Sequence, residues 1–167
     1  MQTHLTVTGF VVHGNRTVLR WHRKNQMWLP PGGHVDPDED PLEALLREVK
    51  EETGLEVEVL PPRERFTGWD RPRQIPPPVT ILVEEIPPIG EEPAHRHVDL
   101  IYFTRALGDT TLRPNPPDLD TRWVDEEEVR RNEGMAVGDC GPAIPLAADV
   151  RALALAAIAR ARELTAG

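Results

Sequence analysis

Cysteine is nearly absent from this sequence of 167 residues, in which Cys140 is the only example. A single cysteine excludes an internal disulfide and a metal site built from thiolates alone. Any metal site should therefore use mainly oxygen ligands. No histidine and aspartate pattern accompanies Cys140, so we expect a small, buried or partly buried residue there and not a nucleophile.

Long apolar runs are also missing. Apolar residues make up 39% of the chain, but no unbroken run approaches the roughly 18 to 20 residues that a membrane helix needs. The first five residues lack the basic start, apolar stretch and small-residue cleavage site of a signal peptide. We therefore expect a cytoplasmic protein with no membrane partner. The length predicts one domain over residues 1–167.

A surplus of positive charge is the third absence, because the formal net charge is −9. Binding to a nucleic-acid duplex needs Lys and Arg side chains that displace counterions from the phosphates, so we expect no duplex partner. The negative charge could simply keep the protein soluble. If the substrate is an anion, however, a cation must lie between it and the protein.

Several segments have the composition of β-strands. Residues 4–12 and 17–21 flank a turn signal at Gly14-Asn15, which predicts a hairpin. Residues 28–33 contain two prolines and two glycines, and we expect a loop there. Further strands are predicted at residues 55–60, 79–83, 98–103 and 122–124.

The clearest helix is predicted at residues 41–53, because both of its ends are marked. Asp40 fits the N-cap, with Pro41 in the first position and Glu43 completing a capping box. Gly54 fits a left-handed stop. An apolar stripe for the core is formed by Leu42, Leu45, Leu46 and Val49.

The rest of the chain is dominated by proline and by the C-terminal helix. Residues 61–97 are rich in proline and form either an insertion that shapes a pocket or long loops around a hairpin. Asp125 and Glu128 predict a second capping box on a short helix, and a Gly- and Pro-rich stretch covers residues 134–145. A long helix is predicted at about 149–164. This order of strands and helices suggests an α/β or α+β sandwich with a mixed sheet.

Carboxylates gather on the helix at residues 41–53. Glu48 and Glu52 lie one turn apart, with Glu51 beside them, at the edge of the apolar stripe. Such a cluster offers the oxygen ligands that Mg²⁺ prefers. It could also be a solvated acidic face. Arg47 could steady the cluster by pairing with Glu39 or Glu51.

The same segment, from Gly33 to Leu55, resembles the Nudix box. That pattern is Gly, five residues, Glu, seven residues, Arg-Glu, an aliphatic residue, any residue, Glu-Glu, any residue, Gly and an aliphatic residue. The resemblance implies an α/β/α sandwich with a mixed central sheet, and residues 28–32 and 122–125 look like flanking pieces of that fold. We expect Trp28 and Trp123 to be core or loop anchors. All nine specified positions are met, by Gly33, Glu39, Arg47, Glu48, Val49, Glu51, Glu52, Gly54 and Leu55.

The resemblance also implies roles for particular residues. Glu48 and Glu52 would bind Mg²⁺, or Mn²⁺, and Glu51 would act as a further ligand or as the base that activates water. The backbone carbonyl of Gly32 would complete the metal site, and Arg47 would belong to the catalytic group. A further base or ligand would come from a later loop, for which we consider Glu84, Glu85, Glu91 and Glu92.

Residues outside the box should contact the rest of the substrate. His95 and His97 could contact phosphate or move a proton, or be exposed histidines, and Asp99 could make a structural hydrogen bond. Arginines that could hold phosphates, each more commonly a surface residue, are Arg20, Arg23, Arg65, Arg71 and Arg73. From this set and the scarce aromatic residues we select Arg65, Arg71, Phe66, Trp69 and His97 as substrate-binding residues.

By this resemblance, the chain is expected to be an enzyme that hydrolyses a pyrophosphate bond in a small-molecule nucleotide. The substrate class is a nucleoside diphosphate linked to another moiety: a nucleoside triphosphate, ADP-ribose, a sugar nucleotide or a dinucleoside polyphosphate. The alternative is a non-catalytic Nudix-like module that senses a nucleotide. An isomerase of prenyl diphosphates would need a catalytic cysteine, which the surroundings of Cys140 do not support. Exposed apolar residues of the Pro-rich stretch could form a homodimer interface.

Overall fold

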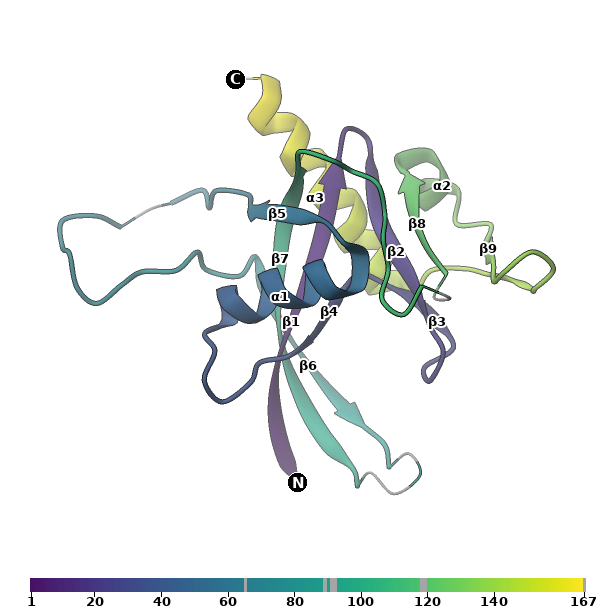
Figure 1. Ribbon diagram of the computed structural model, residues 1–167, viewed down its shortest axis with the longest axis horizontal. Coiled ribbons are helices and arrows are strands. Elements are labelled where there is room, and N and C mark those ends of the chain that lie inside the picture. The colour runs from purple at the N-terminus through teal and green to yellow at the C-terminus, as the bar shows by residue number, and fades with distance from the viewer. Residues whose placement is uncertain (65, 89, 91–92, 118–119, 167) are drawn as a thin grey trace.

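A computed structural model of the chain describes residues 1–64, 66–88, 90, 93–117 and 120–166. Its centre is a mixed sheet of eight strands (Figure 1). The parallel pair is β1 with β7, and the other pairs in the sheet are antiparallel. The strands are β1 (Gln2–His13), β2 (Arg16–His22), β3 (Met27–Leu29), β4 (Gly32–His34), β5 (Glu56–Val59), β6 (Thr80–Ile86), β7 (His95–Leu107) and β8 (Thr121–Asp125).

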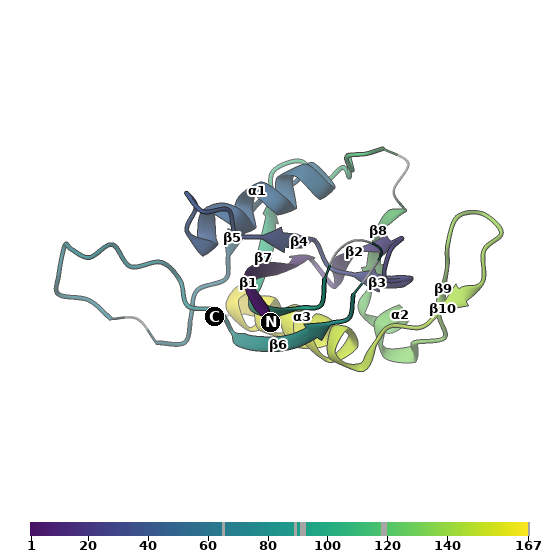
Figure 2. The ribbon, with the colours of Figure 1, turned by 90° about the horizontal axis from the view of Figure 1, so that it is seen from below.

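Two helices cover opposite faces of this sheet. Figure 2 shows α1 (Pro41–Thr53) on one side of the sheet and α3 (Ala148–Ala166) on the other. Alternate residues of β1 enter two separate cores, because successive side chains of a strand point to opposite faces. Val7 and Val11 pack in the α1 core, whereas Phe10 and Val12 pack in the α3 core. The expected α/β/α sandwich with a mixed central sheet is therefore confirmed.

The prediction for α1 is confirmed at both ends. Asp40 accepts hydrogen bonds from the backbone N–H groups of Leu42 and Glu43, and the Glu43 side chain accepts from the N–H of Asp40. Gly54 ends the helix in the left-handed conformation, with φ of 77°. One position in the predicted stripe is wrong, because Leu46 is 39% exposed. Leu45 and Val49 are fully buried and hold the helix against the sheet.

The predicted loop at residues 28–33 is also wrong. Its ends belong to β3 and β4, and only Pro30 and Pro31 lie between the two strands. Glycine makes this possible, since a Cβ at Gly32 would overlap the carbonyl oxygen of Val7 and lie 3.0 Å from Thr8 Cα. The missing side chain therefore lets β4 pair closely with β1 and brings the start of the box onto the sheet.

The Pro-rich region contains all of β6 and the first residues of β7. The long loop between β5 and β6 projects beyond the sheet in both views (Figures 1 and 2). After β8, the predicted short helix is α2 (Glu126–Arg131), and the Gly- and Pro-rich stretch forms a small two-stranded sheet of β9 (Met135–Ala136) and β10 (Ala143–Ile144). Within the described part of the chain, no helix is long and apolar enough to cross a membrane.

The indole groups of both predicted anchors are tied to distant backbone. Trp28 is fully buried, and its Nε1–H donates to the carbonyl of Met135 at 3.2 Å. Trp123 donates in the same way to Thr110 at 3.0 Å. Cys140, in contrast, is exposed, so its predicted burial is wrong. It lies in the turn between β9 and β10.

Candidate active site

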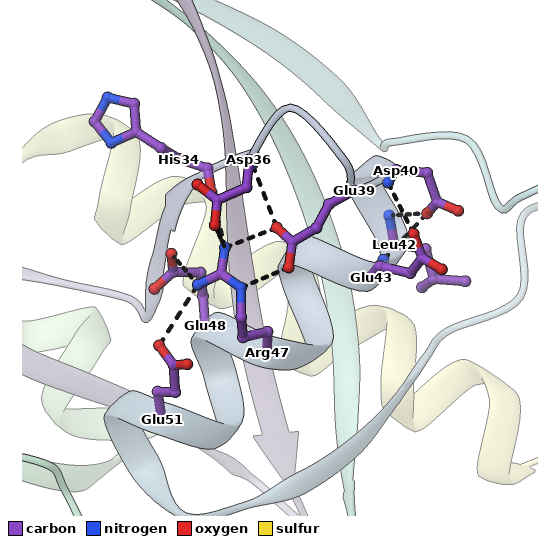
Figure 3. Close-up of polar contacts among 9 residues, drawn as sticks. All are labelled: His34, Asp36, Glu39, Asp40, Leu42, Glu43, Arg47, Glu48 and Glu51. Carbon is purple, nitrogen blue, oxygen red and sulfur yellow. Dashed lines mark hydrogen bonds and ion pairs between the residues drawn. The ribbon is translucent and has the colours of Figure 1, made fainter.

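Arg47 of α1 is the centre of a network of carboxylates (Figure 3). Its Nε and Nη2 donate to both oxygens of Glu39 at 2.6 and 2.8 Å, a bidentate pair. Its Nη1 donates to Glu48 at 2.8 Å and to Glu51 at 3.5 Å. Nη2 also donates to the carbonyl of His34 at 3.1 Å. The hydrogen bond from Arg47 lowers the pKa of Glu39. Both expected pairings of Arg47, with Glu39 and with Glu51, are therefore present.

Glu48 is held against the glycine that begins the box. Its carboxylate lies so close to Gly33 that an added Cβ would overlap it and would be 2.8 Å even from the farther oxygen, Oε2. The Glu48 side chain is only 15% exposed. The glycine thus creates the space that the carboxylate occupies, in a position fixed by Arg47.

Glu52 lies one turn further along α1 and is bound from the opposite side. Arg20 of β2 donates to its Oε1, and the N–H of Gly32 donates to Oε2 at 3.0 Å. Burial raises the pKa of Glu52 to about 7; Arg20 and the Gly32 N–H lower it, while the nearby Glu48 raises it. A further cation beside this buried carboxylate would stabilise its ionised form.

These three glutamates fit a hard divalent cation. Glu48 and Glu52 each have a side chain 15% exposed, whereas Glu51 is 56% exposed and reaches the same network from the solvent side. Two half-enclosed carboxylates one turn apart repel each other unless positive charge lies nearby. Oxygen ligands at the edge of a cavity, with room for water or phosphate oxygens, are what Mg²⁺ and Mn²⁺ prefer.

A cavity of about 320 Å³ extends from Glu52 across the α3 face of the sheet. Its mouth at the box is formed by Gly32, Gly33 and His34, with Arg20 and Lys24 nearby. Val150 and Leu153 of α3 contribute an apolar wall. The volume and the mixed lining suit a small molecule with an anionic end and a less polar remainder.

The far wall of the cavity carries further titratable groups. Burial raises the pKa of Glu84, and Asp99 and Asp149 add to the rise. Asp99 accepts hydrogen bonds from the hydroxyl groups of Thr6 and Thr8 at 3.0 and 2.8 Å, so its expected structural bond is present. His95 and His97 lie on the same wall.

Other residues predicted for substrate binding lie elsewhere. Phe66, Trp69 and Arg71 are exposed on the β5–β6 loop, and they do not line the cavity. Arg73, on the same loop, pairs with the N-cap Asp40. Glu85 is exposed and pairs with Arg96 at 3.2 Å, on the other side of β6 from Glu84. Arg65, Glu91 and Glu92 fall outside the described residues.

Three residues at the cavity were overlooked or only loosely placed from sequence. Arg20 was considered for phosphate, but its partner Glu52 is 32 positions away and no local pattern links them. Lys24 and Asp149 were not considered at all. The signal in the sequence was the alternation of side chains along β2. Leu19 and Trp21 are buried in the α3 core, so Arg20 between them points to the α1 side.

Comparison with known proteins agrees with this geometry. The model of the NUDIX domain matches residues 2–139. The m7GpppN-mRNA hydrolase NUDT17 of Danio rerio is 36% identical over 110 residues, which cover 62% of this chain and 33% of that protein. The RNA pyrophosphohydrolase of Thioalkalivibrio sulfidiphilus is 29% identical over 126 residues, covering 70% and 68%. The chain thus spans about a third of the length of the zebrafish relative.

A solved structure has the same fold over nearly the whole chain. A hydrolase of the NUDIX family from Clostridium perfringens has a TM-score of 0.72 at 22% identity, covering 95% of this chain and 98% of that one. Fold, box and carboxylate network are together those of the NUDIX family. The chain belongs to the NUDIX family, whose hydrolases act on phosphoanhydride bonds of nucleotide-type substrates and typically depend on a divalent metal ion.

Proposed function

We propose that this chain hydrolyses a pyrophosphate bond in a nucleoside diphosphate linked to another moiety, with Mg²⁺ or Mn²⁺ as cofactor. The observation that carries the proposal is the carboxylate set of α1, in which Glu48 and Glu52 are half-enclosed and Glu52 lines the cavity. Glu48, Glu51, Glu52 and the carbonyl of Gly32 would hold the ion. A purely binding module would have no need of all three carboxylates.

When bound, the ion neutralises charge on the phosphates and lowers the pKa of a water molecule. The residues of the chain hold the carboxylates that would bind the ion in fixed positions. Arg47, which is held by Glu39, donates directly to Glu48 and fixes it, and Arg20 with the Gly32 N–H fixes Glu52. Such preorganised carboxylates and cations need little rearrangement when charge develops on the reacting phosphate.

Glu84 is our choice for the residue that takes a proton from the attacking water. Of the four glutamates considered, it lines the same cavity as Glu52, whereas Glu85 faces away. Glu51 is the alternative base, because it lies on α1 beside the two metal ligands. Phe66, Trp69 and Arg71 remain proposals for contact with the far end of a substrate too long for the cavity.

The substrate is proposed from the relatives and the cavity together. The curated relatives include a cap hydrolase, an RNA pyrophosphohydrolase and an asymmetrical bis(5'-nucleosyl)-tetraphosphatase of Mus musculus, which is 56% identical over 39 residues, 23% of this chain and 26% of that one. The names of the cap hydrolase and of the tetraphosphatase denote two nucleosides joined through a chain of phosphates. A dinucleoside polyphosphate is therefore the first choice over a nucleoside triphosphate, ADP-ribose or a sugar nucleotide.

The test is product release from these four substrate classes with Mg²⁺, with Mn²⁺ and with a chelator. Glu52→Gln removes a proposed ligand, and we expect turnover to fall by about 10²-fold or more. Glu56→Gln is the matched control, because the same change is made at an exposed side chain outside the network. Turnover that survives the chelator, or an equal loss in both variants, would contradict the proposal.

A further inference from the structure

Four histidines meet at one end of the sheet, although they are far apart in the sequence. His4 lies in β1, His34 ends β4, and His95 and His97 begin β7. The parallel register of β1 and β7 pairs His4 with His97, and the antiparallel register of β1 and β4 pairs Thr6 with His34. Strand pairing therefore places these side chains on neighbouring positions of one sheet face.

Their ring nitrogens converge. His34 Nε2 lies 3.3 Å from His4 Nδ1, and His95 Nε2 lies 3.0 Å from His97 Nε2. One nitrogen from each of His4, His34 and His97 can be chosen so that all three lie within 4.8 Å of one another. The rings of His4 and His95 are stacked, with centroids 4.7 Å apart.

Hydrogen bonding orients part of the cluster. A backbone carbonyl only accepts, so the Nδ1–H of His95 donates to Pro93 at 3.0 Å. In a neutral cluster, His95 Nε2 then accepts from the Nε2–H of His97, and the unprotonated nitrogen of His97 is Nδ1. Histidine ligands of metals commonly have their other ring N–H held in this manner. His95 is 3% exposed, so this support is rigid.

We propose that His4, His34 and His97 bind a first-row transition-metal ion of the Zn²⁺ type, at a site separate from the carboxylates of α1. Neutral imidazole suits Zn²⁺, Ni²⁺ and Cu²⁺, whereas Mg²⁺ requires oxygen ligands. With metal–nitrogen distances of about 2.0 to 2.1 Å, the three nitrogens must move closer together than they are now. His34 is exposed, so rotation of its side chain disturbs no core packing.

Neighbouring charges favour a cation over a phosphate at this site. Glu84 is opposite His97 in the β6–β7 register, and Asp99 is two residues further along β7. Asp149 lines the same cavity. Three carboxylates so close would repel a phosphate but would add to the attraction for a metal ion. Because His34 and His97 line the cavity, an open position on the ion would face it and could take a water or a phosphate oxygen.

β4 connects the two sites. The carbonyl of His34 accepts a hydrogen bond from Arg47, while its imidazole is directed away from the Arg47 network (Figure 3). One residue thus belongs to the carboxylate network through its backbone and to the histidine cluster through its side chain. The second site does not depend on the proposed hydrolysis, because a ligand set of imidazoles can bind an ion whether or not the chain turns over a nucleotide.

The experiment is equilibrium dialysis of the full chain with Zn²⁺ in the presence of excess Mg²⁺, together with visible absorption spectra of the Co²⁺ form. We expect one Zn²⁺ per chain and a ligand-field spectrum of nitrogen coordination. His34→Asn should weaken binding by about tenfold or more, and the double variant His4→Asn/His97→Asn by about 10²-fold or more. His13→Asn is the matched control, since His13 is an exposed histidine at the other end of β1.

Thermal unfolding in chelator verifies that each variant folds. If the double variant does not fold, His34→Asn still tests the proposal, because the side chain of His34 is exposed. Zn²⁺ binding that is unchanged in His34→Asn would overturn the proposal. So would Zn²⁺ binding that is lost in Glu48→Gln, because the ion would then lie on α1. Inorganic phosphate binding to the metal-free protein that requires His34, without Zn²⁺ binding, would make the cluster an anion site and would also overturn it.

Discussion

The adjacent residues Gly32 and Gly33 have different roles at the site, and alanine substitutions should distinguish these roles. A Cβ at Gly33 meets only the end of the flexible Glu48 side chain, so Gly33→Ala should move that carboxylate with a stability loss below about 1 kcal/mol. Displacement of a catalytic group by about 1 Å can cost roughly 10²-fold in rate, and we expect a fall in kcat of that order. The measurement is kcat together with the urea midpoint.

Gly32→Ala is the comparison for this prediction. Its Cβ would meet the backbone of Val7 and Thr8, which cannot rotate away. We expect a loss of unfolding free energy of about 1 to 3 kcal/mol. If Gly33→Ala instead lost as much stability as Gly32→Ala, with kcat unchanged, Gly33 would serve packing and not the position of Glu48.

Arg47 offers a second test at a single residue. Arg47→Lys keeps the positive charge but cannot make the forked bond to Glu39 while also reaching Glu48 and the His34 carbonyl. We expect kcat to fall by about tenfold or more, because Glu48 loses its fixed position. Arg151→Lys is the control, as Arg151 also donates to backbone carbonyls but lies on α3. A similar kcat for Arg47→Lys and the wild type would show that charge alone suffices.

The carboxylates of the site were predictable from sequence because they are local. Glu48, Glu51 and Glu52 lie within five residues of one helix, and the helix geometry alone gathers them. Arg20 and Glu84 reach the same cavity through strand pairings with residues far along the chain. The histidine cluster is missed for the same reason, because nothing in the sequence joins His4 to His97. A second reason is that the lack of thiolates led us to expect mainly oxygen ligands.

At the scale of an element, α1 is held by its apolar stripe more than by its cap. Asp40→Ala removes the capping box, which should lower the unfolding free energy by about 1 kcal/mol. Leu45 and Val49 remain buried, so we expect kcat to stay within about threefold of wild type. The control is Asp125→Ala, which removes the same motif from α2. A large fall in kcat for Asp40→Ala alone would show that the cap itself positions the glutamates.

The β5–β6 loop gives a prediction for another element. Phe66 and Trp69 are exposed, so the double variant Phe66→Ala/Trp69→Ala should change the unfolding free energy by less than about 0.5 kcal/mol. If these rings stack on the distal base of a dinucleoside polyphosphate, KM for that substrate should rise by about tenfold, whereas KM for a nucleoside triphosphate should not change. Equal KM values in variant and wild type would remove the loop from the substrate site.

Elements were predictable where both their ends and their faces are marked in the sequence. α1 has a cap, a stop and a stripe, and its bounds are those expected. The segment at 28–33 was predicted as a loop because two prolines and two glycines discourage regular structure. The deciding contact is tertiary: Gly32 pairs with Thr8 of β1 and Gly33 pairs with Val7, and only the fold brings these residues together. The exposure of Leu46 is likewise decided by tertiary packing, which buries Leu45 and Val49 and leaves Leu46 39% exposed.

At the scale of the whole molecule, the sheet arranges the two proposed sets of metal ligands beside one cavity, which Glu52, His34 and His97 line. The carboxylates come from α1 on one face, and the imidazoles come from β1, β4 and β7 on the other face. β4 passes between them. The chain carries a net charge of −9, and cations at these two places would offset it where an anionic substrate must bind.

Metal binding at the carboxylates should therefore appear as stability of the whole fold. An ion that binds only the native state adds about 2.7 kcal/mol at 100 times its Kd, and at roughly 2 to 4 °C per kcal/mol this raises Tm by about 5 to 10 °C. Mg²⁺ should produce this rise in the wild type and in Glu56→Gln but not in Glu52→Gln, and a chelator should reverse it. His34→Asn should keep the Mg²⁺ effect in full. A Mg²⁺-dependent rise that persists in Glu52→Gln and disappears in His34→Asn would mean that the ion binds at the histidines and that the assignment of the two sites is wrong.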